Sequence, residues 1–267
     1  MGVVIDTVGG YAVNPGSTAY AAATAANGDA FQVRVFDTQQ RATLHALIRG
    51  GATKGSVRIT SPNFHDAVRG ITFSTDVDPT NYEMPQETGQ PLVPGDSLAV
   101  SLLGGTAETD VLAYRVYYEN LPGAQARLAS WADISSLIAN IKPVEIDVTT
   151  NATAGQWEDT LIDSTEALLK ASYDYAVLGY TTDTAVSVIG IKGAETSNYR
   201  VCGPGTDNTI ITANYFVEES MKHGKPYIPI VSGVNQGAIY CSVLHHAASV
   251  TGKVQLILAQ LSQKVSV

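Results

Sequence analysis

The histidines are the residues of this sequence best suited to bind a metal ion or to transfer protons. His45, His65 and His223 stand apart along the chain, whereas His245 and His246 are adjacent and directly follow an expected strand. Neighbouring side chains on a strand point to opposite faces, so this pair is not expected to share one metal ion. The sequence contains no G-x-S-x-G, G-x-x-x-x-G-K-[ST], G-x-G-x-x-G or H-E-x-x-H motif. It therefore predicts no catalytic, cofactor-binding or metal-binding residue, and a protein that is not an enzyme.

An acidic segment from Asp76 to Glu83 gathers three carboxylates and an amide within eight residues. Calcium prefers such oxygen-rich loops, but an EF-hand loop also needs a Gly at its sixth position and a Glu at its twelfth. Neither is arranged that way here. We interpret the segment as a solvated turn, with a structural Ca²⁺ as the alternative.

The two cysteines, Cys202 and Cys241, lie in apolar, strand-like surroundings. Buried free thiols are common in such places. Two cysteines in a chain of 267 residues are no disulfide framework, although one disulfide between them is left open.

Composition and charge exclude several classes of protein. The net charge is −9, and Lys and Arg never form a cluster, whereas a nucleic-acid groove needs clustered cations. We therefore expect no tight binding of nucleic acid. The N-terminus lacks the basic region and apolar run of a signal peptide, and no window of 18 apolar residues predicts a transmembrane helix. Thirteen tyrosines against five phenylalanines favour a binding or assembly surface, because tyrosine tolerates one buried and one wet end.

An internal repeat is the feature that organises the chain. Six segments of the first half recur in the same order in the second half, at offsets of 135 to 143 residues, with insertions confined to loops. Collinear matches of this kind favour a duplication over one large domain whose strands merely share composition. The matched pairs are 4–6 with 145–147, 48–50 with 191–193, 57–62 with 199–204, 89–94 with 224–229, 98–103 with 239–244, and 114–121 with 254–261.

Short alternating runs such as Phe31 to Val35 and Tyr114 to Tyr118 predict strands, seven or eight in each half. The stretch from Ala124 to Ile141 has apolar residues at three- and four-residue spacing, so it predicts an amphipathic helix between the halves. Weaker helices are predicted over 157–171 and 17–26. The predicted fold is all-β, with two tandem antiparallel jelly-roll-like sandwiches joined by a short amphipathic helix. The predicted boundaries are 1–123 for the first domain, 124–143 for the linker helix and 144–267 for the second domain, an internal duplicate of the first.

Two similar sandwich halves without an active-site motif resemble the double jelly-roll major capsid proteins of icosahedral, often membrane-containing viruses and tailless phages. The resemblance covers nearly the whole chain and rests on architecture and length, not on a motif. It implies a structural virion protein that self-assembles as trimers into an icosahedral shell, with six sandwiches in each pseudo-hexagonal tile. It also implies copies of the chain and other virion proteins as partners, and a place in the virion after synthesis in the host cytoplasm.

Two other classes of protein fit the same pattern. One is a carbohydrate- or receptor-binding double sandwich, such as an adhesin or an attachment protein. The other is a hydrolase on a β-sandwich scaffold, with catalytic carboxylates on distant loops that the sequence alone cannot bring together.

Overall fold

The computed structural model describes residues 2–75, 80–84, 89–123, 126–162, 169–205 and 212–265, and these residues form an all-β protein of four antiparallel sheets. We number the sheets I to IV in the order in which they stack. Sheet I consists of β2 (Ala21–Ala22), β5 (Gly55–Thr60), β6 (Ile71–Thr75) and β9 (Ala99–Leu103). Sheet II consists of β1 (Gly2–Val13), β3 (Thr24–Ala25), β4 (Arg41–Gly50), β7 (Thr80–Glu83), β8 (Gln90–Leu92) and β10 (Thr109–Leu121).

The second half of the chain supplies the other two sheets. Sheet III consists of β13 (Trp157–Leu161), β15 (Val188–Gly193), β16 (Val201–Pro204) and β18 (Ile239–Leu244). Sheet IV consists of β11 (Leu128–Ala129), β12 (Ile138–Thr149), β14 (Asp174–Thr182), β17 (Ile228–Ser232) and β19 (Thr251–Leu261).

The two halves have the same strand order. The first half pairs its strands as β1-β10-β4-β7 and β2-β9-β5-β6, and the second as β12-β19-β14-β17 and β13-β18-β15-β16. The last strand of the first half, β10, lies between β1 and β4, and the last strand of the second half, β19, lies between β12 and β14. All of these pairs are antiparallel. This nested pairing of first strands with last strands is that of a jelly roll. The structure thus confirms the predicted tandem of β-sandwiches.

The alternation of apolar and polar residues explains why each strand has one face in a core. In β12, Val144, Ile146 and Val148 are buried, whereas Glu145 and Asp147 between them are exposed. The two predicted closing strands, 114–121 and 254–261, are the central strands β10 and β19, and their inward side chains are fully buried. They lie in the sandwich cores, as the repeat predicts.

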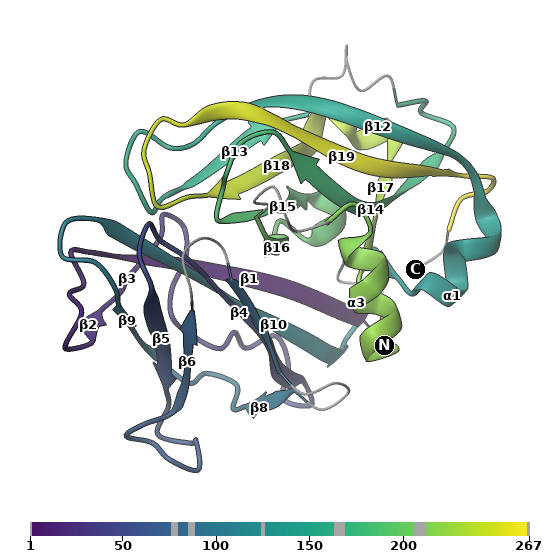
Figure 1. The fold of residues 1–267 in the computed structure, drawn as a ribbon. Coiled ribbons are helices and arrows are strands. Elements are labelled where there is room, and N and C mark those ends of the chain that lie inside the picture. The colour runs from purple at the N-terminus through teal and green to yellow at the C-terminus, as the bar shows by residue number, and fades with distance from the viewer. Residues whose placement is uncertain are drawn as a thin grey trace.

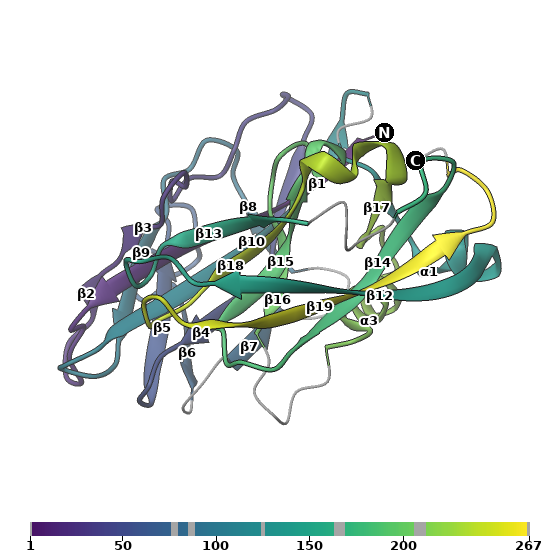
Figure 2. The same cartoon turned by 90° about the horizontal axis from the view of Figure 1, so that it is seen from above.

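The four sheets form a stack in which sheet II of the first half faces sheet III of the second half (Figures 1 and 2). Sheets I and II enclose the core of the first sandwich, and sheets III and IV enclose that of the second. Figure 1 shows β12 and β19 of sheet IV on the far side of the second half, away from the first half. Sheet II is therefore covered on both faces, while the outer faces of sheets I and IV are the two ends of the stack.

The connection between the halves is less helical than predicted. A capping box between Ser130 and Asp133 starts the one-turn helix α1 (Trp131–Ile134), and a 3₁₀ turn (Ser135–Leu137) follows it. Residues 138–143, which we predicted to be helical, belong to the edge strand β12, and β11 before the helix already pairs with sheet IV. Pairing of Ile138 to Thr149 with β19 replaces the predicted helix, so tertiary hydrogen bonds override the three- and four-residue apolar spacing. The division at 123 and 144 into separately folding domains stays a prediction.

The other two predicted helices are also wrong over the residues that the structure describes, and residues 163–168 of the helix predicted over 157–171 lie outside them. Residues 157–161 form β13 and residues 21–25 form β2 and β3, because these segments pair with β18, β9 and β1. The nine-residue helix α3 (Tyr215–His223) was not predicted. It ends at Gly224, whose φ of 60° suits the left-handed C-cap position, and it packs beside β14 and β17.

The repeat is real in the fold, but two of its six matched segments are one strand out of step. The segments at 4–6, 89–94, 98–103 and 114–121 overlap strands that occupy the same place as their matches in the other half. In contrast, residues 48–50 end β4 but were matched to residues of β15, which is the counterpart of β5. Residues 57–62 overlap β5 but were matched to residues of β16, which is the counterpart of β6. Adjacent strands of one sandwich share composition, so short local matches cannot distinguish them.

Candidate functional site

The described residues include no group of three or more His, Cys, Asp and Glu side chains placed to hold a metal ion. His65 is exposed on the loop after β5, far from the other histidines in the sequence. Residues 76–79 of the acidic segment lie outside the described residues, and residues 80–83 form β7. The expected absence of catalytic and metal-binding residues stays a prediction.

His245 and His246 lie together, contrary to the expectation that they point to opposite faces. Their Nδ1 atoms are 3.1 and 3.3 Å from the Ser187 hydroxyl, and their rings are 4.1 Å apart. The pair follows the end of β18, so the alternation of strand side chains does not apply to it. Ser187 is fully buried, and burial lowers the pKa of His245 to about 3. A nucleophilic serine must be reachable by substrate, so we interpret this contact as structural. It lies within the second half, and Ser187 packs against Gly50 of the first half.

Both cysteines are buried free thiols on different sides of sheet III. Cys202 faces the first half, whereas Cys241 lies in the core of the second sandwich. Burial raises the pKa of Cys241 to about 12 and raises the pKa of Cys202 as well. Such thiols remain protonated and unreactive at neutral pH.

A buried polar cluster around Arg115 joins the two halves. Arg115 of β10 is fully buried, and its guanidinium donates to Glu219 and Tyr215 of α3. It also lies 5.2 Å from the ring centre of Tyr227, within range of a cation–π interaction. Burial alone would lower the pKa of Arg115, but Glu219 and the tyrosines hold it above its usual value. The sheet II strand is thereby locked to the helix of the other half.

Two imidazoles stack next to this ion pair. His45 of β4 and His223 of α3 have ring centres 4.6 Å apart, and His45 also contacts the hydroxyl of Tyr227. Burial, followed by the nearby charge of Arg115, lowers the pKa of His45 to about 2. Burial also lowers the pKa of His223 to about 4, although Glu219 opposes that shift. Both rings are therefore neutral at pH 7, and adding a proton to either would place a charge against Arg115.

A second polar cluster lies in the same contact between sheets II and III, where the N–H of Thr7, which pairs with Arg115, donates to the carbonyl of Arg200. Asp29 accepts hydrogen bonds from the Trp157 indole at 2.7 Å and from the backbone of Gly9 at 2.6 Å. Arg200 stacks on the Trp157 ring at 4.7 Å and reaches both Asp29 and Asp159. Burial raises the pKa of Asp29, while its hydrogen bonds and Arg200 oppose that shift. Trp157 sits on Gly9, where a Cβ would come within 2.7 Å of the indole nitrogen, so only glycine allows this close approach.

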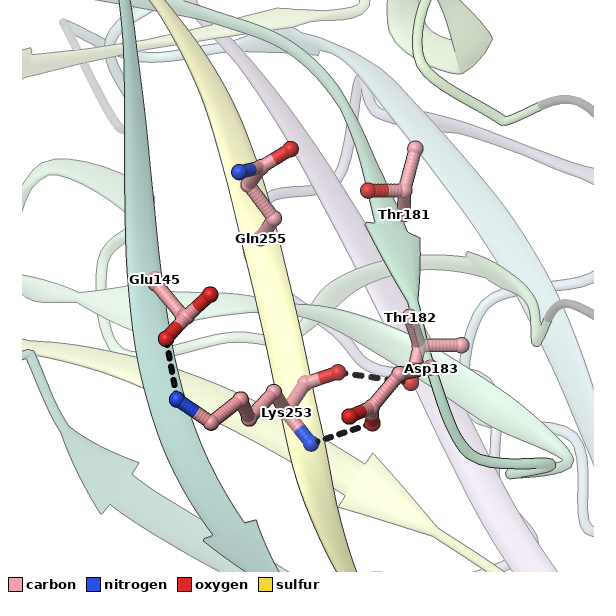
Figure 3. Close-up of a pocket in the computed structure, with 6 residues that line it drawn as sticks. All are labelled: Glu145, Thr181, Thr182, Asp183, Lys253 and Gln255. Atoms are coloured by element: carbon pink, nitrogen blue, oxygen red, sulfur yellow. Dashed lines mark hydrogen bonds and ion pairs between the residues drawn. The ribbon is translucent and has the colours of Figure 1, made fainter.

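The outer face of sheet IV carries a shallow polar hollow of about 240 Å³. Its lining side chains come from β12, β19 and the end of β14, and they are Glu145, Thr181, Thr182, Asp183, Lys253 and Gln255 (Figure 3). Lys253 pairs with Glu145 across the two strands, and its backbone N–H donates to Asp183 at 2.6 Å. Asp147 lies 3.7 Å from the same ammonium group and is strongly exposed. Three carboxylates around one cation leave this part of the face negative.

The excess of tyrosine predicted a binding or assembly surface, which stays a prediction, whereas several tyrosines are buried between the two halves of the chain. Tyr117, Tyr215 and Tyr227 are buried where the halves meet, and burial raises their pKa values. Arg115, Glu219, Trp157 and Arg200 were not singled out. The available signal was an arginine in the middle of an otherwise apolar strand, which implies a buried partner.

No protein-family model and no curated protein matches this sequence. Among solved structures, a chain from the atomic structure of Sulfolobus Turreted Icosahedral Virus is 9% identical, with 99% of this chain and 81% of that chain covered and a TM-score of 0.28. The STIV major capsid protein (MCP) is 9% identical over 97% of this chain and 96% of that chain, with a TM-score of 0.20. The PBSX exported protein XepA is 8% identical over 93% and 86%, with a TM-score of 0.22. All three scores are below 0.5, so these likenesses to capsid structures and to XepA are weak and no functional argument rests on them.

Proposed function

We propose that this protein is a structural virion protein, a major capsid protein whose copies associate as trimers into an icosahedral shell. The observation that supports the proposal is the way its two sandwiches meet. The main strands of sheet II are β1, β10, β4 and β7. Sheet III of the other half contains β13, β18, β15 and β16, which are the counterparts of the sheet I strands β2, β9, β5 and β6. Two like units therefore touch through unlike faces, a heterologous contact.

Heterologous contacts propagate, because each sandwich keeps one unused face and the two unused faces of the chain are of unlike kinds. In this chain those faces are the outer sides of sheets I and IV. Sheet IV of one copy can therefore meet sheet I of the next in the way that sheet II meets sheet III within the chain. Such contacts form a ring if the rotation closes and a filament if it does not. Three copies would supply the six sandwiches of a closed, nearly six-fold ring.

The outer face of sheet IV is polar, unlike the covered face of sheet II, and a polar outer face suits a subunit that is made before it assembles. The outer side of sheet IV carries charged and hydroxyl side chains, among them Glu145, Asp147, Lys253 and Thr181. Polar outer faces keep a free subunit soluble before it assembles. The net charge of −9 also opposes strong binding of nucleic acid. No helix in the described ranges is both long and apolar enough to cross a bilayer.

Light scattering on a size-exclusion column tests the proposal directly. We expect a mass of three times the 28.1 kDa of one chain, and closed rings or larger shells by electron microscopy. A monomer at every protein concentration would overturn the proposal, and so would an open filament without closed particles.

A carbohydrate- or receptor-binding protein is the second candidate, and the polar hollow on sheet IV is the observation that favours it. Carboxylate, amide and hydroxyl groups such as those of Glu145, Gln255 and Thr181 can hydrogen-bond sugar hydroxyls. A monomer that binds a glycan array, with binding lost in Gln255→Ala, would support this candidate against the first. That the protein is not an enzyme stays a prediction, tested by turnover of glycosidic and ester substrates.

A further inference from the structure

A paired aromatic and arginine side chain makes the contact between sheets II and III. Trp157 begins β13, Arg200 stacks on its ring, and the indole lies on Gly9 of β1 while both side chains reach Asp29. In sheet II, Gly9 pairs with Ala113 of the neighbouring strand β10. Trp157 and Arg200 therefore lie over the place where β1 and β10 of sheet II run side by side.

Sheet I carries a similar pair on its outer face, where both side chains are partly exposed. Tyr20 immediately precedes β2, the counterpart of β13, and Arg58 of β5 lies 4.3 Å from the centre of its ring. Arg58 points to the outer side of sheet I, where its Nε donates to Ser101 at 3.3 Å. Arg58 lies on β5, whereas Arg200 immediately precedes β16, but the combination of planar ring and cation is the same.

The matching place on sheet IV is the polar hollow. At the repeat offset of 140 residues, Ala113 corresponds to Lys253, which pairs with Asp147 of the first strand β12 as Ala113 pairs with Gly9. The spot that Trp157 covers on sheet II thus corresponds to the Asp147–Lys253 pair, next to Glu145 and Asp183. Here the surface is hollowed and net negative, so it complements a cation rather than an indole.

We propose that Tyr20 and Arg58 of one copy dock into the sheet IV hollow of the next copy, with Arg58 pairing with Glu145 and Asp183. This contact rests on the proposed self-assembly and identifies the residues that make it specific. Charge pairs at the edge of an interface steer association and set partner choice. Glu145 and Asp183 are exposed in the free chain and Tyr20 and Arg58 are partly exposed, so we expect exchanges at these positions to leave the fold intact.

Charge reversal and its rescue test the contact. Arg58→Glu and Glu145→Lys should each raise the dissociation constant of the oligomer about ten-fold or more, and the double variant should regain most of the affinity. Arg69→Glu is the matched control, because Arg69 is exposed on the loop before β6. Sedimentation velocity at low and high salt measures the association, and circular dichroism verifies the fold of every variant. The weakening should be larger at low salt.

The outcomes separate this contact from the proposed function. If the wild type assembles and Arg58→Glu assembles equally well, the contact is wrong while the proposed function stands. Equal weakening by Arg69→Glu, or a double variant no better than the single ones, would also overturn the contact. A monomeric wild type would overturn both. A second probe of the pair is Tyr20→Ala, which should weaken assembly while Tyr20→Phe does not, because stacking needs only the ring.

Discussion

Sheets II and IV hold equivalent strands of the two sandwiches, yet their outer faces have opposite character. At the offset of 140 residues, the outward residues Val111, Ala113 and Arg115 of β10 correspond to Thr251, Lys253 and Gln255 of β19. The first three are fully buried under the second half, whereas Thr251 and Lys253 are exposed. One strand position can therefore be core or surface, depending on what the rest of the chain places over it.

The inward faces of the same strands are alike. Tyr114 and Val116 of β10, and Val254 and Leu256 of β19, are all fully buried. Each sandwich needs its own core, so the inward positions are under the same constraint in both halves. The outward positions are constrained only where a neighbour covers them. The comparison predicts that equal substitutions at corresponding outward positions have unequal effects.

The largest contrast is expected between Arg115→Ala and Gln255→Ala. Removing Arg115 leaves Glu219 buried without its main cation, which should cost about 3–5 kcal/mol of stability. The corresponding change on the open face should stay within about 0.5 kcal/mol. Chemical denaturation measures both. Similar losses in the two variants would show that the outer face of sheet IV is also covered in the folded chain.

Acid should destabilise the covered contact through His45 and His223. Both imidazoles have pKa values below the usual 6.5, so the unfolded chain binds their protons first. Their contribution is therefore intact above pH 6.5 and is lost as the pH falls, down to about 4 for His223 and about 2 for His45.

Between pH 6 and 5 each ring should remove up to about 1.4 kcal/mol. Buried carboxyls such as Asp29 have raised pKa values and act in the opposite direction, so a variant must isolate the histidines. His223→Gln should reduce the loss of unfolding free energy between pH 6 and 5 by up to the contribution of one imidazole, about 1.4 kcal/mol. Denaturation curves at pH 6 and 5 measure this difference, and an unchanged slope would contradict the assignment.

Gly9→Val tests the close approach of Trp157 to sheet II. A Cβ at this position lies 2.7–2.9 Å from the indole, so the two halves would have to move apart at a cost of about 1–3 kcal/mol. Asp147→Val is the matched change on sheet IV, where the position is exposed and should tolerate it. Thermal melts with Trp fluorescence measure stability and the indole environment together. A Gly9→Val protein with wild-type fluorescence and melting temperature would rule out the tight contact.

The smallest effect is expected for Lys253→Ala. The ammonium group is half exposed and its partners Glu145 and Asp147 are solvated, so the melting temperature of the free chain should not change measurably. A clear drop in melting temperature would mean that this ion pair holds the sandwich together. Its effect on assembly is a separate readout, since the same side chain lines the hollow.

Much of the fold could be predicted from local patterns. Period-two alternation identified the strands from Tyr114 and Val254 onward, and the repeat indicated two sandwiches. The predicted helix over 124–141 was mostly wrong, because its apolar residues are divided among β11, a single helical turn, a 3₁₀ turn and the start of β12, where Ile141 is exposed. A periodic pattern indicates which residues are apolar, but pairing with β19 determines that the backbone from Ile138 onward is a strand.

The residue pairs that form the contact between the halves could not be predicted from the sequence. Arg115 and Glu219 are 104 residues apart, and Trp157 and Asp29 are 128 apart. The sequence by itself determined that each half forms a sandwich, because inward alternation needs only the strand and its own sheet. Which outer face became core, and which stayed open with a negative hollow, was decided by the packing of sheet II on sheet III. Burial depends on the whole arrangement in space, so only the tertiary structure distinguishes Ala113 from Lys253 as core and surface.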